Sequence, residues 1–443
     1  MSTLKAVRGT RDLLPPETAL WNHIEATARA VFARYNFGEI RTPIFEDTAL
    51  FARGVGEETD IVSKEMYTWE DRARAQSEKT QSLTLRPENT AGVVRAYIEH
   101  KLGETGQLQK LYYIGPQFRR ERPQRGRYRQ FSQIGAEVIG PASAGSESPL
   151  RDAEVLEMLA TLLDELAIRG WTLKINSVGS ASDRPAYIAK LREALKPVVG
   201  QMCEDCQRRA DTNPLRVLDC KVPADQPIIE TLPRIADSLD DASKAHFAAV
   251  CAALDKAGVP YVQDHRMVRG LDYYTRTTFE FTHGGQPSAD ATGTAPILGA
   301  QNALLGGGRY DGLSEALGGP KAPGIGFAMG EDRLVLMLQA IAASQTDLAD
   351  AYIAPLGEAQ NPAALELARE LRRSGLRVEL GDGSFRLKKS FETADKVARA
   401  IVLLGEDEVQ SGILTVKEFA RGVQSKVARA DLAATLAAVT PTT

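Results

Sequence analysis

The sequence predicts an α+β protein, with a first domain built on a mostly antiparallel sheet flanked by helices, a helical insertion and a C-terminal α/β domain. Two strand patterns within residues 110–139 flank an arginine-rich segment and predict a long hairpin. Helical patterns dominate residues 178–258, and strands alternate with helices over 350–433. The expected parts are 1–177 and 259–343 for the first domain, 178–258 for the insertion and 350–443 for the C-terminal domain.

The composition is that of an ordinary globular protein, with 443 residues, 43% hydrophobic and 25% charged. No apolar run approaches the roughly 18 residues that cross a bilayer. The first eight residues lack the apolar core of a signal peptide. Four cysteines are too few for a disulfide scaffold, which favours a reducing compartment. We therefore expect a cytoplasmic protein with no membrane partner.

The first 105 residues predict two helices and two short strands. Leu20, Ile24 and Val31 recur at helical spacing, which predicts a helix over 17–35. A short strand over 39–43 should end at Pro43, because proline cannot donate to a ladder. A second strand is expected at 82–85, and Pro87 should open a helix that runs to Leu102.

The second strand of the hairpin, residues 130–139, has two different faces. Ile134, Ala136 and Val138 form an apolar face, because alternate residues of a strand point to opposite sides. The other face carries Phe131, Gln133, Gly135 and Glu137. A carboxylate, an amide and a glycine fit the floor of a polar pocket, but an ordinary solvent-exposed face fits the pattern equally well.

Residues 110–130 hold seven basic residues against one acid, a net charge of +6, on a chain whose net charge is −4. A solvated surface segment is the usual explanation of such a run. Six of the seven are arginines interleaved with Gly126, Tyr128 and Phe131. Arginine forks bind phosphate in a bidentate way, so this composition favours an anion site.

The remaining patterns complete the expected fold. A helix over 152–168 should precede a strand over 171–176, and another strand is expected at 276–281. The glycine-rich run 306–312 is interpreted as a turn, and 324–330 as a strand leading into a helix over 331–341. Residues 342–349 mark a boundary. The last domain should contain strands at 351–354, 377–380, 400–404 and 413–416 and helices at 364–374 and 387–398.

Several familiar chemical motifs are missing. The sequence contains no P-loop, no dinucleotide-binding glycine spacing and no nucleophile signature. Cys203 and Cys206 resemble half of a zinc site, and Cys220 follows, but no second Cys-x-x-Cys exists. Four sulfurs including Cys251 could converge; we nevertheless expect ordinary thiols and no zinc. The remaining arginines, carboxylates and tyrosines suit a reaction in which the protein positions charges around a transferring phosphoryl group.

Several motifs together resemble one family. The first helix, strand and Pro43 resemble motif 1 of the class II aminoacyl-tRNA synthetases, residues 118–137 resemble motif 2, and 324–333 resemble motif 3. The segments 269–274 (RGLDYY) and 306–312 (GGGRYDG) resemble the two signatures of the histidyl-tRNA synthetases. The opening RGTRD and the LRPENT segment at 85–90 add to a collinear match that covers essentially the whole chain.

The resemblance implies a histidine–tRNA ligase that uses ATP. Such an enzyme joins L-histidine to AMP with release of pyrophosphate, then transfers histidine to the 3′ end of histidine tRNA. Mg²⁺ would bridge the phosphates, with no side-chain metal ligand expected. Motif 1 implies a homodimer, and residues 350–443 resemble an anticodon-binding domain. The 13 acidic and 13 basic residues between 348 and 443 give that domain no net charge.

The resemblance also assigns residues. Arg119 and Arg269 would approach the α-phosphate and Arg333 the γ-phosphate, and these three arginines are the expected catalytic residues. The expected ATP-binding residues are Arg119, Glu121, Arg127, Phe131 and Arg333. The expected histidine-binding residues are Glu88, Asn89, Thr90, Gln133, Glu137, Arg269, Tyr273 and Tyr274.

The chain departs from the family pattern at two places. Asn89 stands where the family usually has glycine, although asparagine tolerates left-handed backbone angles. The loop 283–298 is longer than expected. Two rival interpretations are a catalytically silent paralogue that regulates histidine biosynthesis and a class II synthetase for another amino acid. The C-terminal domain and the full arginine set argue against the first rival, and residues 269–274 argue against the second.

Overall fold

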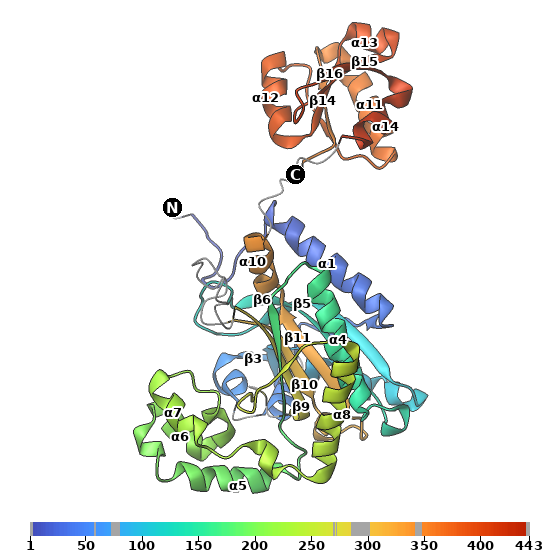
Figure 1. The fold of residues 1–443 in the computed structure, drawn as a ribbon. Helices are drawn as coiled ribbons and strands as arrows, with labels where there is room; N and C mark the ends of the chain where they lie inside the picture. The colour runs from blue at the N-terminus through green and yellow to red at the C-terminus, as the bar shows by residue number, and fades with distance from the viewer. Residues whose placement is uncertain are drawn as a thin grey trace. The chain divides into compact units, whose positions relative to one another are not determined.

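The computed structural model describes residues 3–56, 59–71, 80–268, 271, 273–284, 302–341 and 348–439. The chain divides into two compact units, residues 1–343 and residues 344–443. Each is described by itself below, and Figure 1 shows the elements of both. The loop at 283–298 and the boundary at 342–349 fall largely outside the described residues. Within the described part of the chain, no helix combines the length and the apolar character that a membrane span requires.

The first unit is built on an eight-stranded sheet in the order β1-β5-β6-β11-β10-β9-β7-β8. Neighbouring strands from β5 to β7 are antiparallel, and the two edge strands are parallel to their neighbours. The predicted mostly antiparallel sheet is therefore confirmed. The strands are β1 (Gly38–Glu39), β5 (Gln109–Phe118), β6 (Gln130–Ile139), β7 (Trp171–Ser177), β8 (Val262–Gln263), β9 (Thr275–His283), β10 (Ala303–Arg309) and β11 (Gly324–Gly330).

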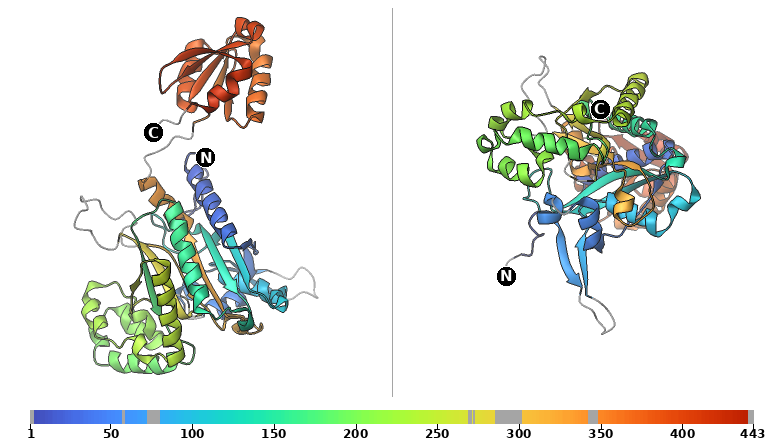
Figure 2. Two further views of the ribbon diagram at one scale, coloured as in Figure 1. Left: turned by 45° about the vertical axis from the view of Figure 1, so that its right-hand side comes forward. Right: turned by 90° about the horizontal axis from the view of Figure 1, so that it is seen from below.

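Four helices cover one face of this sheet, as Figures 1 and 2 show. They are α1 (Glu17–Arg34), α4 (Pro149–Glu165), α8 (Asp241–Ala257) and α10 (Glu331–Ile341). Their apolar faces share one core with Ile134, Ala136 and Val138 of β6, so the predicted apolar face of that strand is confirmed. The polar residues of β6 lie on the opposite face of the sheet, away from these helices.

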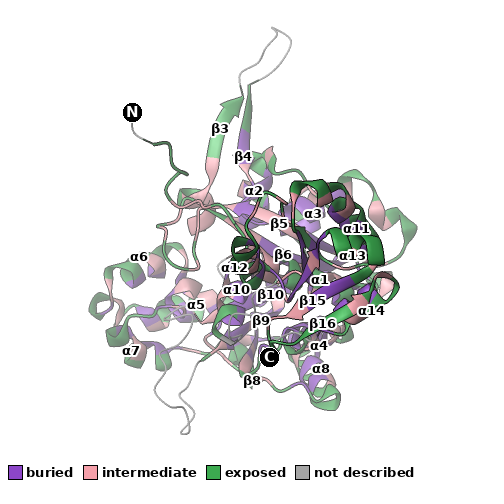
Figure 3. Cartoon of the chain, turned by 90° about the horizontal axis from the view of Figure 1, so that it is seen from above, coloured by how far each residue is buried: buried purple, intermediate pink, exposed green. Residues whose placement is uncertain are grey.

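A second, three-stranded antiparallel sheet has the order β2-β4-β3 and projects from the first unit (Figures 2 and 3). Its strands are β2 (Phe45–Asp47), β3 (Tyr67–Asp71) and β4 (Gln81–Leu85). The helices beside it are α2 (Thr48–Val55) and α3 (Thr90–Glu99), with a short π-helix at Ile61–Glu65 between β2 and β3. The outer part of β3 is exposed.

Several element boundaries differ from the sequence prediction by a few residues, and two of them lie close to the site. The strand expected over 39–43 is only the two-residue β1. The helix expected to open at Pro87 begins at Thr90 instead. The reason is local: the Glu88 carboxylate accepts hydrogen bonds from the backbone amides of Thr90 and Ala91, at 2.8 and 3.0 Å, and so occupies the first free donors of α3.

The glycine-rich run was predicted wrongly as a turn, because Gly306, Gly307 and Gly308 lie inside strand β10. A Cβ on Gly307 would lie 2.1 Å from the carbonyl oxygen of Gly326 on the adjacent strand, and one on Gly308 2.7 Å from the carbonyl of Thr277. Both distances are impossible for real side chains. The glycines therefore serve close strand packing, and only Gly312, with φ of +102°, uses a left-handed turn conformation.

The segment between β7 and β8 is mostly helical, with α5 (Arg184–Leu195), α6 (Glu204–Thr212), α7 (Gln226–Glu230) and α8, joined by 3₁₀ turns. Its own core includes Tyr187, Leu191 and Val217. Tyr274 belongs to the same core, and Leu271 and Tyr273 pack against it. The insertion is thus continuous with residues that follow it on the way back to the main sheet. A short helix, α9 (Leu313–Ala316), lies after β10.

The second unit contains a five-stranded sheet in the order β13-β12-β14-β15-β16. Its core joins Ile353, Leu367 and Val402 with residues of the other strands and helices. Three elements were not predicted from the sequence: the short helix α13 and the last strand and helix. The elements are β12 (Ala351–Pro355), α11 (Asn361–Arg373), β13 (Val378–Leu380), α12 (Leu387–Val397), β14 (Ala400–Leu404), α13 (Glu406–Ser411), β15 (Ile413–Glu418), β16 (Gln424–Ala428) and α14 (Arg429–Ala437).

A buried ion network ties β10 to the helices. Arg309 and Asp152 are fully buried, and Nε of Arg309 donates to both carboxylate oxygens of Asp152, at 2.8 and 3.1 Å. The ring of His246 on α8 lies 2.8 Å from the same carboxylate, and Asp311 pairs with Nη1 of Arg309 at 2.9 Å. Burial of these charges is tolerated because each has a partner.

Removing one member of this network should be costly. Arg309→Met is expected to lower the free energy of unfolding by about 3–5 kcal/mol, because it removes the guanidinium partner of the buried Asp152 and leaves only the His246 ring beside it. Lys321→Met is the matched control, since its ion pair with Glu147 is exposed and should contribute less than about 1 kcal/mol. Urea denaturation of both variants measures the difference. Equal, small losses would contradict the structural importance of the network.

Candidate active site

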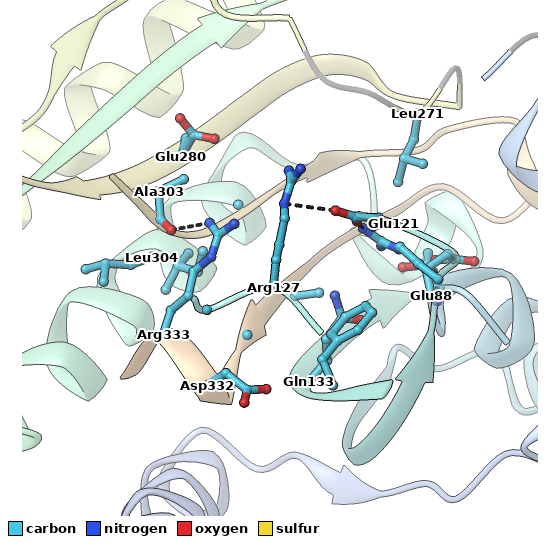
Figure 4. A pocket seen from close by; sticks show the side chains of 18 of the residues that line it. Glu88, Glu121, Arg127, Gln133, Leu271, Glu280, Ala303, Leu304, Asp332 and Arg333 are labelled. Carbon is cyan, nitrogen blue, oxygen red and sulfur yellow. Dashed lines mark hydrogen bonds and ion pairs between the residues drawn. The ribbon is translucent and has the colours of Figure 1, made fainter. Parts of the chain in front are cut away.

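A cavity of about 240 Å³ opens over the polar face of the main sheet. Strands β6, β10 and β11 form its floor, and the walls come from the hairpin loop after β5, the turn before α3 and the segment before β9 (Figure 4). The residues around it are Glu88, Thr90, Arg119, Glu121, Gly126, Arg127, Tyr128, Phe131, Gln133, Leu271, Tyr273, Tyr274, Glu280, Ala303, Leu304, Leu305, Gly306, Ala328, Gly330, Asp332 and Arg333.

The floor is polar on β6 and small on its neighbours. In register, Gln133 faces Gly330, and Glu137 faces Gly326 of β11. A Cβ on Gly326 would lie only 1.6 Å from Oε2 of Glu137, so glycine at this position is what makes room for the carboxylate. Gln133 and Glu137 are both buried. Of the two interpretations of this face, the polar pocket is therefore the one that the structure has.

One wall carries the arginines of the hairpin loop. Nε of Arg119 donates to the carbonyl oxygen of Pro87 at 2.9 Å, and its guanidinium lies 5.2 Å from the ring centroid of Phe131. Nε of Arg127 is 2.9 Å from the Glu121 carboxylate, which is also 3.8 Å from Arg119. Glu121 thus orients both arginines and balances only part of their charge.

The opposite wall presents Arg333 from the first turn of α10. Its Nη1 donates to the carbonyl oxygen of Ala303 at 2.6 Å. Burial, and then the positive charge of Arg127, lower the pKa of Arg333. Figure 4 shows Arg127 and Arg333 extending into the same space, with Glu280 beside them. Cations gathered from residues some 200 positions apart favour an anionic ligand between them.

The deep end of the cavity holds two carboxyl groups. Oγ1 of Thr90 donates to Oε1 of Glu137 at 2.8 Å, while the Glu88 carboxylate is held by backbone amides. Burial raises the pKa of Glu88, and it raises that of Glu137 to about 8. Oε2 of Glu137 and Oε1 of Gln133 are buried without a hydrogen-bond partner among the described residues. Buried acceptors of this kind require donors, which a ligand can supply.

Three tyrosines surround this end. The ring centroids of Tyr273 and Tyr274 are 4.7 Å apart, and that of Tyr310 is 6.1 Å from Tyr273. Burial, more than any neighbouring charge, raises the pKa of Tyr273 and Tyr310 well above its usual range. Their hydroxyl groups stay protonated and can donate a hydrogen bond to a ligand.

Most of the residues assigned from the sequence meet at this cavity; two described ones do not line it, and a third lies outside the described residues. Asn89 is buried beside it, where its Oδ1 accepts a hydrogen bond from Thr42 at 2.6 Å. Glu137 is fully buried at the deep end and is not among the lining residues, and Arg269 falls outside the described residues. The assigned residues that line the cavity are Glu88, Thr90, Arg119, Glu121, Arg127, Phe131, Gln133, Tyr273, Tyr274 and Arg333.

The sequence interpretation missed Glu280, Asp332 and Tyr310. Strand β9 was predicted, and its register with β10 places Glu280 opposite Gly306. Tyr310 was part of the glycine-rich signature but was assigned to a turn. Asp332 carries an ion pair to Arg11 at 3.0 Å, so it anchors the N-terminal segment beside the cavity. Strand alternation at Glu280 was the one signal in the sequence that could have found it.

Comparison with known proteins decides the family. The model "Histidyl-tRNA synthetase" matches residues 9–334, and an anticodon-binding domain model matches 350–438. The chain belongs to the histidyl-tRNA synthetase family. A relative from Koribacter versatilis named histidine–tRNA ligase is 72% identical over 97% of this chain and 95% of its own length. One from Solibacter usitatus with the same name is 56% identical over 98% and 99%.

A solved structure agrees with this membership. The apo histidyl-tRNA synthetase of S. aureus has a TM-score of 0.75 and 36% identity, covering 98% of this chain and all of that one. The resemblance to motifs 1, 2 and 3 and to the histidine signatures was therefore a sound basis for recognising a histidyl-tRNA synthetase. The family's class II fold is confirmed.

The raised pKa of Glu137 has a measurable consequence. In the folded protein Glu137 keeps its proton up to a pH of about 8, whereas in the unfolded chain it ionises near 4.5. Its contribution to stability is therefore complete below about pH 4.5 and is lost as the pH rises towards 8. The free energy of unfolding of the wild type minus that of Glu137→Gln should fall over this range and level off above it.

Denaturant unfolding between pH 5 and 9 measures that difference. Burial also raises the pKa of Glu331 to about 8, but Glu331 is present in both proteins and cancels. A difference that stays flat across the range would mean that Glu137 ionises near its usual pKa.

Proposed function

We propose that this chain is a histidine–tRNA ligase that activates L-histidine with ATP and transfers it to the 3′ end of histidine tRNA. The observation that carries the proposal is one cavity with two unlike ends. Arginines from two distant segments line one end, and buried carboxyl and tyrosine groups form the other. The first end suits a triphosphate, and the second suits the α-ammonium group and a donor–acceptor side chain of a small amino acid.

At the arginine end, Arg119 contacts the α-phosphate of ATP and Arg333 the γ-phosphate. Arg119 is oriented by Pro87 and Glu121, so it is already positioned before negative charge develops. Phe131 presents its ring for stacking with adenine, and Arg127 adds charge beside the phosphates. Arg269 completes the set of catalytic arginines in this proposal.

Mg²⁺, when bound with ATP, would neutralise charge on the phosphates. The cavity residues offer carboxylates at Glu121, Glu280 and Asp332, and carboxylate oxygens are ligands that Mg²⁺ accepts. Glu280 is the one that faces Arg333 in Figure 4. The donor set therefore fits a metal held jointly by phosphate and protein oxygens.

At the deep end, the two unpartnered acceptors explain recognition of histidine. Oε1 of Gln133, with Glu88 and Thr90, receives the α-ammonium group. Oε2 of Glu137 pairs with one imidazole nitrogen, and Tyr273 and Tyr274 stand at the imidazole side. A site that hydrogen-bonds its substrate in this way rejects analogues lacking those groups by about 10⁴–10⁵-fold.

The other parts of the proposal concern partners and location. We assign residues 350–443 to anticodon binding, supported by the domain match, and a homodimer to motif 1 around β1. A cytoplasmic location is supported by the four cysteines, all of which are free thiols.

Pyrophosphate exchange with each of the twenty amino acids tests the substrate. We expect exchange with histidine alone, because only an imidazole pairs with both Glu137 and the tyrosine hydroxyls. Exchange with another amino acid at a comparable rate would point to a synthetase of different specificity, and no exchange at all would point to a catalytically silent protein.

Two arginine variants on the same loop separate chemistry from surface charge. Arg119→Gln should slow exchange by about 10²–10³-fold, the scale of removing one preorganised donor. Arg125→Gln is the matched control, since Arg125 is exposed and does not line the cavity. Equal effects of the two changes would contradict the role of Arg119.

Removal of the second unit tests the division of labour. A chain ending near residue 343, where the first unit ends, should keep pyrophosphate exchange within a few-fold of the full chain and lose most aminoacylation of histidine tRNA. The two assays run on one preparation give the comparison. A proportional loss of both activities would argue against a separate tRNA-binding role for residues 350–443.

A further inference from the structure

Three cysteines and one aspartate meet inside the insertion, away from the active-site cavity. They are Cys203, Cys206, Cys220 and Asp225, and one ligand atom from each lies within 4.8 Å of all the others. Cys203 and Cys206 come from the start of α6, whereas Cys220 and Asp225 come from the turns that precede α7. None of the four lines the cavity of the proposed ligase. The cluster therefore needs its own explanation.

The distances have the scale of a tetrahedral metal site. Sγ of Cys203 and Sγ of Cys220 are 3.9 Å apart, and Sγ of Cys220 is 3.2 Å from Oδ2 of Asp225. In a tetrahedron with Zn–S bonds of about 2.3 Å, two sulfurs are separated by about 3.8 Å. A disulfide would instead bring the sulfurs to about 2.05 Å. The observed sulfur separation matches the edge of a ligand tetrahedron.

Asp225 supplies an independent observation. Its side chain is 1% exposed, and its hydrogen-bond partners within the described residues are the backbone amide of Cys203, at 3.1 and 3.3 Å, and the thiol of Cys220. No arginine, lysine or histidine of the described chain forms an ion pair with it, in contrast to the buried Asp152, which has Arg309. A buried carboxylate without a cationic side chain is expensive unless a cation is bound beside it.

The backbone around the cluster is arranged for negative ligands. Cys203 is the N-cap residue of α6 and Cys206 lies in its first turn, the end of a helix where the dipole favours negative charge. The amide of Val222 donates to Sγ of Cys220 at 3.4 Å. Amide–sulfur hydrogen bonds of this kind orient metal ligands and reduce their charge.

We propose that Cys203, Cys206, Cys220 and Asp225 bind one structural Zn²⁺. The three thiols each release a proton to solvent on binding, and the ionised carboxylate completes four ligands. A closed set of four protein ligands leaves no position for substrate, so the site is structural. The proposal reverses the sequence expectation of ordinary thiols without zinc, which rested on the missing second Cys-x-x-Cys. The fourth ligand is a carboxylate, and Cys251 lies on α8 in the other core.

The metal would link two segments of the insertion that pack on the same hydrophobic core. Cys206 and Cys220 are part of the cluster that contains Tyr187, Val217 and Tyr274. Zn²⁺ would fix the N-terminus of α6 to the turn before α7, which in turn supports the packing under the tyrosines of the cavity. Loss of the metal should therefore lower the melting temperature of the protein more than it weakens ATP binding.

Metal analysis of the full chain tests the proposal. Protein purified without an affinity tag should contain about one zinc per chain, and so should the matched control Cys251→Ser. Cys220→Ser should contain less than a tenth of that amount and melt at a lower temperature. Zinc at the wild-type level in Cys220→Ser, or no zinc in the wild type after incubation with ZnCl₂ under reducing conditions, would overturn the site.

Asp225→Asn addresses the case in which Cys220→Ser does not fold. It keeps the shape of the side chain and should weaken zinc affinity in a chelator competition by at least about 10-fold, the loss that even an outer-shell partner produces. Co²⁺ in place of zinc should give thiolate charge-transfer and tetrahedral d–d absorption in the wild type. Unchanged affinity, an octahedral cobalt spectrum or a Cys203–Cys220 disulfide would each refute the assignment. None of these outcomes depends on histidine activation, which pyrophosphate exchange measures separately.

Discussion

The register between β6 and β11 is the constraint on which the rest of the first unit depends. Seven successive residue pairs, from Ile139 with Gly324 to Gln133 with Gly330, align these strands. Since side chains alternate, a slip of one residue would turn Gln133 and Glu137 towards the helices and Ile134 towards the cavity. The correct register also brings the arginine loop that precedes β6 close to Arg333, which follows β11. Strand pairing thereby brings arginines from two distant segments to one cavity.

The same sheet holds groups that the protein alone leaves in electrostatic conflict. Like-charged guanidinium groups share one end of the cavity, and two carboxyl groups with raised pKa share the other. Such frustration is costly in a free protein and is concentrated at functional sites. A histidine–tRNA ligase binds substrates of complementary charge at both ends. In the proposed function, the residues that weaken the empty site are the ones that the substrates would satisfy.

Elements with strong periodicity were predicted correctly from the sequence. The predictions failed where contacts between distant segments determine the local conformation. The hairpin strands at 110–118 and 130–139 and the helix at 331–341 match β5, β6 and α10, because alternation and helical spacing are local signals. Gly306–Gly308 could not be placed in a strand from the sequence. Glycine is needed there because the backbones of β9 and β11 pack too close for a side chain, which is a tertiary contact. Asp225 could not be predicted as a ligand for a similar reason, because only folding brings it close to the cysteines. Motif resemblance identified ten of the 21 cavity residues, but it could not reveal the unpartnered oxygens of Gln133 and Glu137.

The insertion and the tyrosines of the cavity share one hydrophobic core, so the packing of one region depends on the other. Tyr274 belongs to the same core as residues of α5 and α6 that do not line the cavity, so its position depends on packing away from the cavity. Evolution can therefore retune amino acid discrimination by repacking the insertion while every residue in contact with histidine stays the same. Comparisons of enzymes in this family that consider only cavity residues would overlook this source of variation.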